Sequence, residues 1–244
     1  MDPSIARHCA ELNRCNQRGG RMLSVLDLLD ADTLGLDLAA YLMARISRGA
    51  SFLVGAVPGG AGKTTVMCAL LNLLPKDVVL EAATAEAVRR AGHAEEAGKR
   101  CYVCHEIGSG PYFAYLWDRD LRDYCALADK GHVLATNLHA DDLDEAHAQI
   151  CVQNRAPEAH FRHFALMLFL HVGGGYTRRS RRVETVYAAE GAGPHRLVYD
   201  AGRGVQPSLE SAWERRCRDF LEEEFRSGRR EIEAVRGRVL AFME

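Results

Sequence analysis

The sequence predicts an α/β fold with a largely parallel β-sheet, followed by a short antiparallel strand pair and C-terminal helices. The first observation is an alternation, over residues 20–172, of short apolar runs with longer segments of helical periodicity. The second is a glycine-rich stretch that follows one apolar run and precedes a helical segment. The third is the change of pattern after residue 172. Alternating strands and helices favour a parallel sheet, because the helices form the crossover connections.

The core elements follow from this alternation. Strands are predicted at the apolar runs 51–56, 77–80, 100–105, 132–138 and 164–172. Helices are predicted at 22–29, 34–46, 64–74, 84–99, 118–130 and 141–152. Gly131 ends one helix, because glycine accepts the left-handed conformation of a C-terminal cap. Asp141 or Asp142 begins another helix as its N-cap.

The last part of the chain is predicted to differ from the core. Residues 181–188 and 195–199 are predicted to be antiparallel strands, joined by a turn at 190–193. Two amphipathic helices follow; the first begins at Pro207-Ser208 and ends at Gly228. The predicted division is an N-terminal segment (1–21), a core (22–172), and a hairpin and helical tail packed on the core (173–244).

The composition is that of an ordinary globular protein. Of 244 residues, 48% are hydrophobic and 26% are charged, and the net charge is −2. No overall charge therefore attracts the chain to nucleic acid, and no direct nucleic-acid contact is expected. The longest apolar stretch, 164–172, is too short to span a bilayer. Because the N-terminus also lacks the apolar region of a signal peptide, a cytoplasmic protein is expected.

The eight cysteines are scattered along the chain and are expected to be free thiols, as is usual in the cytoplasm. Cys101 and Cys104 have the CxxC spacing, and Cys9 and Cys15 would be needed to complete a zinc site. The Tyr-Val pair between them favours the other interpretation, a buried strand in which cysteine acts as a small hydrophobe.

Residues 57–65 are predicted to form a phosphate-binding loop, because they lie between a predicted strand and a predicted helix. Backbone N–H groups and the helix N-terminus would attract phosphate oxygens. Lys63 would reach the β- and γ-phosphates of ATP, and the Thr64 hydroxyl would complete the shell of a Mg²⁺ ion. A glycine turn without a ligand is the alternative. The usual pattern has glycine where Val57 stands. The predicted nucleotide-binding residues are Pro58, Gly59, Gly60, Ala61, Gly62, Lys63, Thr64 and Thr65.

Two further polar residues follow predicted strands. Glu106 comes just after the strand at 100–105, where a carboxylate would orient an attacking water or hold Mg²⁺ through water. His139 ends an Asn-Leu-His sequence after another strand, where it would sense the γ-phosphate or position water. The alternatives are an exposed glutamate at a strand end and a packed or surface histidine.

In this order, the three elements resemble those of the ATPases of type II and type IV secretion systems, which also drive pili and archaella. The resemblance covers about residues 22–190. It includes the helix after the loop (64–75), a glutamate motif ending at His105-Glu106, and a histidine box at 130–140. It implies a RecA-like fold, catalytic roles for Glu106 and His139, and a ring-shaped hexamer that couples ATP hydrolysis to mechanical work. It also implies a membrane-protein partner and a location at the inner face of the membrane.

The sequence departs from this family at two motifs. The acidic box is replaced by Ala82-Ala83-Thr84, although Glu81 and Glu86 lie close, and the arginine after the glutamate motif is absent. A catalytic arginine must then come from elsewhere. The basic cluster offers Arg178, Arg179, Arg181 and Arg182. These would contact a neighbouring subunit, a partner or phosphate, or simply form a solvated hairpin edge.

Three functions are consistent with these features. The first is an ATP-hydrolysing motor subunit of a secretion or pilus system, and the second is a non-hydrolysing or regulatory nucleotide-binding module. The third is a small-molecule kinase, whose basic lid would be supplied by Arg89, Arg90 and Lys99-Arg100.

Overall fold

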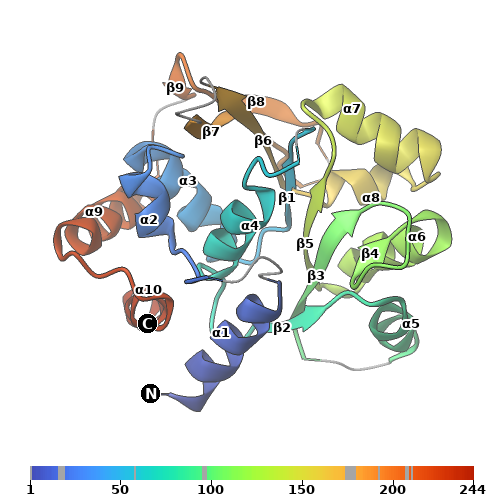
Figure 1. Ribbon diagram of the computed structural model, residues 1–244, viewed down its shortest axis with the longest axis horizontal. Coiled ribbons are helices and arrows are strands. Elements are labelled where there is room, and N and C mark those ends of the chain that lie inside the picture. Colours follow the sequence, from blue (N-terminus) through green and yellow to red (C-terminus); the bar gives the residue numbers. More distant parts are fainter. Residues whose placement is uncertain are drawn as a thin grey trace.

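The computed structural model describes residues 2–15, 20–57, 59–94, 98–173, 180–191, 193–206, 209 and 211–244. These residues form one nine-stranded sheet with helices on both faces (Figure 1). The strand order is β2-β3-β5-β1-β6-β7-β8-β9, and β4 pairs with β3 outside this path. No helix among the described residues is long and apolar enough to cross a membrane.

The strands confirm the predicted sheet type. The pairs among β1 to β6 are parallel, and those from β6 to β9 are antiparallel. All predicted strands are present, and the short strands β4 and β9 are additional. The bounds are β1 Phe52–Gly55, β2 Val79–Ala82, β3 Arg100–Ile107, β4 Tyr115–Leu116, β5 Val133–Leu138, β6 Leu166–Gly173, β7 Ser180–Ala188, β8 Arg196–Asp200 and β9 Gly204–Val205.

The helices also follow the predicted order. Gly131 caps the 3₁₀ turn after α6 with a φ of 80°, and Asp142, not Asp141, is the N-cap of α7. The bounds are α1 Pro3–Cys15, α2 Val25–Asp30, α3 Leu36–Ile46, α4 Lys63–Leu71, α5 Ala85–His93, α6 Asp118–Ala126 with the 3₁₀ turn η1 Leu127–Lys130, α7 Leu143–His147 with the π-helical segment η2 Ala148–Gln153, α8 Glu158–Arg162, α9 Ala212–Arg226 and α10 Ile232–Met243.

The sheet separates two hydrophobic cores. Helices α1 to α4, α9 and α10 contribute to the first, and α5 to α8 cover the opposite face (Figure 1). Strand β1 is buried on both sides, because Phe52 and Val54 belong to the first core and Leu53 to the second. A strand buried on both faces needs a continuous apolar run, which explains why the sequence signal for β1 is clear.

Helix α1 lies in the N-terminal segment, for which the sequence pattern predicted no element. It packs on α4, α10 and β2, and its buried residues are His8, Cys9, Leu12 and Cys15. Only one of the four is a strongly apolar residue, and histidine and cysteine are weak indicators of helical periodicity. The burial of Cys9 and Cys15 shows that cysteine acts as a small hydrophobe in this layer.

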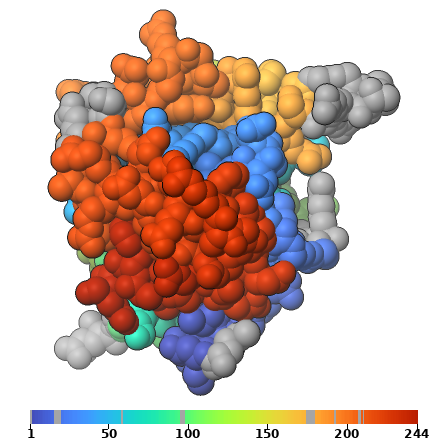
Figure 2. All heavy atoms as spheres, turned by 90° about the vertical axis from the view of Figure 1, so that its left-hand side faces the viewer, coloured from blue at the N-terminus to red at the C-terminus, as the bar shows by residue number. Residues whose placement is uncertain are grey.

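The C-terminal helices pack on the core of their own chain. Figure 2 shows α9 and α10 covering one face of the molecule beside the segment around α2 and α3. Phe242 on α10 stacks on Phe220 of α9, with the ring centroids 4.4 Å apart. The predicted start of α9 at Pro207-Ser208 lies outside the described residues. The helix begins after Ser211, whose hydroxyl accepts from the N–H of Glu214 in a capping box.

The end of β1 approaches its neighbours too closely for any side chain. A Cβ atom at Gly55 would lie 2.6 Å from the carbonyl oxygen of Ala140 and 2.7 Å from a ring carbon of Phe169. Glycine at this position therefore lets the backbone pass between β5 and β6 immediately before the loop at residues 57–62.

Candidate nucleotide-binding site

A glycine-rich loop joins β1 to α4. Gly60 and Gly62 have φ values of 80° and 98°, which glycine adopts without steric cost. Gly62 is the N-cap of α4, and no side chain caps this helix end. The first N–H groups of α4 therefore have no side-chain partner at the N-cap, as an anion-binding helix start requires.

The loop borders a pocket of about 430 Å³, within the range of small-molecule sites. Its lining combines the loop with two other predicted site residues, Glu106 and His139. The described loop residues in the lining are Gly59, Gly60, Ala61, Gly62, Lys63, Thr64 and Thr65. Pro58 lies outside the described residues. Arg21, Met22, Leu23, Cys68 and Tyr115 also line the pocket and were not singled out from the sequence.

Lys63 links the predicted residues at the centre of the site. Its Nζ donates to the carbonyl oxygen of Ala56 at 2.9 Å and lies 3.2 Å from His139 Nδ1. Glu106 Oε1 is 3.6 Å from the same Nζ. Burial lowers the pKa of Lys63, and the charge of Glu106 opposes this shift. The site therefore holds a largely desolvated cation that anionic oxygens would stabilise.

Glu106 lies near the end of β3 and is 8% exposed. Its Oε1 accepts no hydrogen bond from any described residue. The nearest basic side-chain nitrogens are Lys63 Nζ, 3.6 Å away, and His139 Nε2, 3.9 Å away. Burial raises the pKa of Glu106, while Lys63 and His139 act in the opposite direction. A buried carboxylate oxygen with unused acceptor capacity is suited to bind a water molecule or a hydrated cation.

His139 follows β5, and its side chain is half exposed. Its Nδ1 lies 3.1 Å from the carbonyl oxygen of Val57 as well as near Lys63. A protonated Nδ1 donates to the carbonyl, and an unprotonated Nδ1 accepts from the lysine. Either tautomer connects the histidine to the loop and leaves Nε2 directed toward Glu106.

Two residues beside His139 hold the loop and were not predicted. Asn137 is fully buried; its Nδ2 donates to the carbonyl oxygen of His105 at 2.9 Å and lies 3.5 Å from Thr64 Oγ1. Asp141 accepts from the N–H of Val57 at 2.7 Å. This bond fixes the first turn of the loop where the usual glycine is absent. The sequence feature that could have identified Asn137 is its polar amide within the apolar run of β5.

The two described arginines of the basic cluster, Arg181 and Arg182, lie in different surroundings on β7. A Cβ built at Gly62 would lie 3.4 Å from Arg181 Cδ, so the Arg181 side chain lies against the loop of its own chain. Arg181 lies in β7, opposite Val172 of β6. Arg182 instead pairs with Glu184 at 2.8 Å. Arg178 and Arg179 lie outside the described residues.

Three of the four basic residues considered for a kinase lid are paired elsewhere. Arg90 and Arg100 both bind Glu81, at 2.5 and 3.0 Å, and Arg89 lies 3.2 Å from Asp120. None of them lines the pocket. Glu81, one of the two carboxylates near the altered acidic box, is therefore engaged in ion pairs away from the phosphate loop.

The CxxC pair does not form a metal site. Cys101 and Cys104 are free and buried in β3, and they belong to the first and second hydrophobic cores respectively. Residues three apart in a strand face opposite sides of the sheet, so the two sulfurs cannot share an ion. The interpretation as small hydrophobes is confirmed.

No protein-family model matches the chain, and no curated protein matches it in sequence. The similar solved structures include the VirB11 ATPase from the Brucella suis type IV secretion system in complex with sulphate, at 19% identity and a TM-score of 0.45. They also include the Legionella pneumophila ATPase DotB, at 12% identity and 0.42. The alignments cover 77% and 85% of this chain, and 57% and 58% of those chains. This chain thus spans less than two thirds of either structure.

Proposed function

We propose that the chain binds MgATP at residues 58–65 and hydrolyses it, as a RecA-like motor subunit of a secretion or pilus system. The observation that carries the proposal is the convergence of Lys63, Glu106 and His139 on one glycine loop, in a pocket of about 430 Å³. A lysine at a helix start, with a carboxylate and a histidine at the ends of neighbouring strands, suits phosphoryl transfer to water.

The roles follow from the ligand-free contacts. Bound phosphates would attract Lys63 from the carbonyl oxygen of Ala56 and from Glu106, since charge-assisted contacts are stronger than neutral ones. Glu106 would then accept a proton from the attacking water or orient it. The Thr64 hydroxyl, beside Asn137, would hold Mg²⁺, whose charge would neutralise the β- and γ-phosphate oxygens.

Arg181 would supply the positive charge for which the sequence offers no arginine after Glu106. Its position against Gly62 supports a contribution within one chain. Arginine at the γ-phosphate can be worth about 10³–10⁵ in rate in other phosphoryl-transfer sites. Arg178 and Arg179 stay candidates for a neighbouring subunit, in a cytoplasmic ring of six that would act on a membrane-protein partner.

The primary test compares Lys63→Ala with Lys76→Ala, because Lys76 is an exposed lysine paired with Glu244. Each charge-assisted contact is worth about 1.5–3 kcal/mol, so Lys63→Ala should lose at least tenfold in ATP affinity by calorimetry. Lys76→Ala should bind like the parent. Equal ATP affinity in the two variants would contradict the prediction that residues 57–65 bind phosphate.

The ring and the role of Arg181 need separate measurements. The specific rate of ATP hydrolysis, measured without an added acceptor, should rise with protein concentration if the ring completes the site. Arg181→Ala should lower turnover while retaining ATP binding, whereas Arg182→Ala, which only breaks the pair with Glu184, should not. A monomer that hydrolyses at a concentration-independent specific rate would exclude the ring and leave a contribution of Arg181 within one chain.

A non-hydrolysing or regulatory module is the second candidate. It is favoured by the pairing of Glu81 with Arg90 and Arg100, which keeps one of the two carboxylates near the altered acidic box away from the site. This module would bind ATP with the same dependence on Lys63 but release no phosphate at any protein concentration. The ion pairs of Arg89, Arg90 and Arg100 count against the kinase, because they engage three of the four basic residues of its lid.

A further inference from the structure

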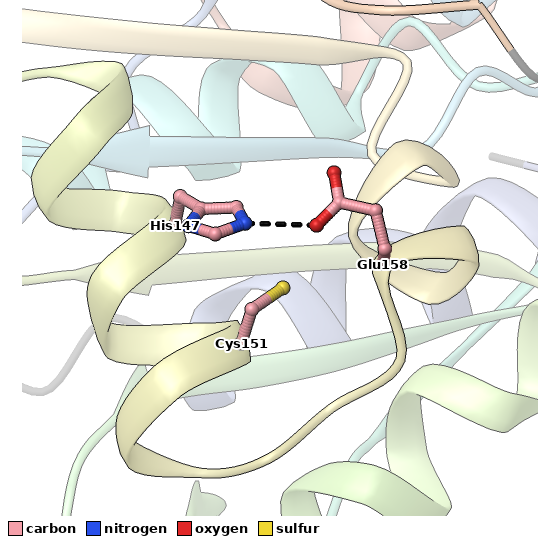
Figure 3. A group of neighbouring side chains, drawn as sticks. All are labelled: His147, Cys151 and Glu158. Carbon is pink, nitrogen blue, oxygen red and sulfur yellow. Dashed lines mark hydrogen bonds and ion pairs between the residues drawn. The ribbon is translucent and has the colours of Figure 1, made fainter.

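A second group of reactive side chains lies outside the nucleotide pocket. His147 ends α7, Cys151 lies one helical turn later in η2, and Glu158 begins α8 after the intervening turn. Their nearest ligand atoms all lie within 4.8 Å of one another (Figure 3). Among the residues that the structure describes, this is the group of histidine, cysteine and carboxylate side chains close enough together to hold a metal ion. None of the three lines the nucleotide pocket.

The backbone and one aromatic ring orient these side chains. Positions i and i+4 of a helical segment share a face, which brings His147 and Cys151 together. His147 Nε2 lies 2.8 Å from Glu158 Oε2, and its ring packs edge-on against Phe161, with the centroids 5.2 Å apart. Figure 3 shows the imidazole, the sulfur and the carboxylate directed toward a common space.

Cys151 differs from the other cysteines in its surroundings. All eight are free; seven are buried, and Cys151 is half-buried. His147 and Glu158 are also partly exposed, at 41% and 49% of their side-chain surfaces. An ion from solution can therefore reach all three ligands without opening a hydrophobic core.

The ligand set selects the class of ion. Thiolate and imidazole are preferred by zinc-type ions, whereas Mg²⁺ and Ca²⁺ prefer oxygen ligands. One thiolate and one carboxylate balance a charge of 2+. Zinc–ligand bonds of about 2.0–2.3 Å place tetrahedral ligand atoms about 3.5 Å apart, so small side-chain rotations would complete the site.

We propose that His147, Cys151 and Glu158 bind one zinc-type divalent ion, with solvent as the fourth ligand. On binding, the Cys151 thiol releases its proton to solvent as the metal–sulfur bond forms, and no electron is transferred. The ion joins η2 to α8 and thereby closes the turn at residues 154–157. Arg155 in this turn has a φ of 58°, which is costly for a residue with a side chain. None of the three ligands lines the pocket at the glycine-rich loop, so ion binding does not depend on nucleotide binding.

A neighbouring cluster provides the matched control. His160 Nε2 and His163 Nε2 each lie 2.9 Å from a different oxygen of Asp129. This cluster has two histidines and a carboxylate but no sulfur. His163→Gln therefore removes a potential ligand at a similar exposure, and only the proposed site gives a thiolate–metal signal.

The experiment is a Co²⁺ titration of the folded full chain without nucleotide, followed by displacement with Zn²⁺. The parent should bind one Co²⁺ with a near-ultraviolet thiolate-to-cobalt band, and Zn²⁺ should abolish that band. Cys151→Ser should lose the band and at least tenfold in affinity, and Glu158→Gln should bind more weakly than the parent. His163→Gln should behave like the parent. The proposal is wrong if the folded parent gives no band, if Cys151→Ser keeps it, or if His163→Gln loses it.

A second measurement uses only the parent protein, in case a variant does not fold. Zn²⁺ should slow the alkylation of one thiol at least tenfold, and peptide mass analysis should identify that thiol as Cys151. Unchanged alkylation of Cys151 at saturating Zn²⁺ would overturn the proposal even if the metal bound elsewhere.

Discussion

Glu224 on α9 and Glu106 on β3 are both almost completely buried, with 3% and 8% of their surfaces exposed. Both oxygens of Glu224 accept from arginines: Oε2 from Arg229 at 2.5 Å and Oε1 from Arg238 at 2.6 Å. Glu106 Oε1 accepts from no described residue and faces Lys63 at a distance of 3.6 Å. Burial is thus similar, while hydrogen bonding is complete at one carboxylate and incomplete at the other.

The difference distinguishes a fully compensated buried charge from an incompletely compensated one. Burying a carboxylate is costly unless hydrogen bonds compensate for the lost water. Glu224 has that compensation and stabilises the contact between α9 and α10. Glu106 has only part of that compensation, from Lys63 Nζ at 3.6 Å, so its burial costs stability. Groups with such perturbed environments are enriched at functional sites, which supports the role proposed for Glu106.

The largest expected effect is on turnover in Glu106→Gln. Glutamine retains the shape of the side chain but cannot accept a proton, and general bases contribute about 10²–10⁴ in rate. ATP turnover should fall at least tenfold while the affinity for ATP is retained. Steady-state phosphate release with parallel calorimetry measures both, and Glu224→Gln is the control with normal turnover. Parental turnover in Glu106→Gln would exclude Glu106 as the general base.

The second largest effect is on stability, where Glu224→Gln is expected to lose more than Glu106→Gln. Glu224→Gln weakens two charge-assisted hydrogen bonds and should lower the free energy of unfolding by about 1.5–3 kcal/mol. The loss stays moderate because Arg229 and Arg238 are partly exposed and regain water. Glu106→Gln should unfold at the same denaturant concentration as the parent or a higher one. The comparison fails if urea denaturation shows the larger loss in Glu106→Gln.

The smallest effect is a pH dependence. Burial raises the pKa of Glu106 above its ordinary value of 4.5, so the folded chain binds this proton more tightly than the unfolded chain does. The contribution of Glu106 to stability is therefore greatest below pH 4.5 and falls as the pH rises through the folded-state pKa. The stability of Glu106→Gln relative to the parent should increase from pH 4 to pH 7. A constant difference in urea denaturation across this range would contradict the raised pKa.

The sequence predicted the sheet type and the core helices because their signals are local. Each core strand is an apolar run, and Gly131 marks the end of η1 by its conformation. Helix α1 was missed because a histidine and two cysteines make up most of its buried face, and α8 because five residues are too few to show a period. The strand order arises from contacts between distant segments, which no local pattern encodes.

The candidate site was predictable as a set of residues but not as a geometry. The sequence suggested Lys63, Glu106 and His139 separately, and the fold brings them together. It gave no reason to place Arg181 against Gly62, because that contact depends on β7 joining the sheet beside β6. Asp141 was considered as a helix cap, whereas its carboxylate holds the phosphate loop.

Gly55 shows how space alone can restrict the amino acid at a position that does not line the pocket. A Cβ there would overlap both the carbonyl of Ala140 and the ring of Phe169, on opposite neighbours of β1. Gly59 has an open surrounding and an ordinary φ, so it would accept alanine on steric grounds. In a library covering every substitution, position 55 should therefore tolerate fewer residues than position 59. The restriction on substitutions at position 55 would come from the packing of β1, two residues before the loop begins.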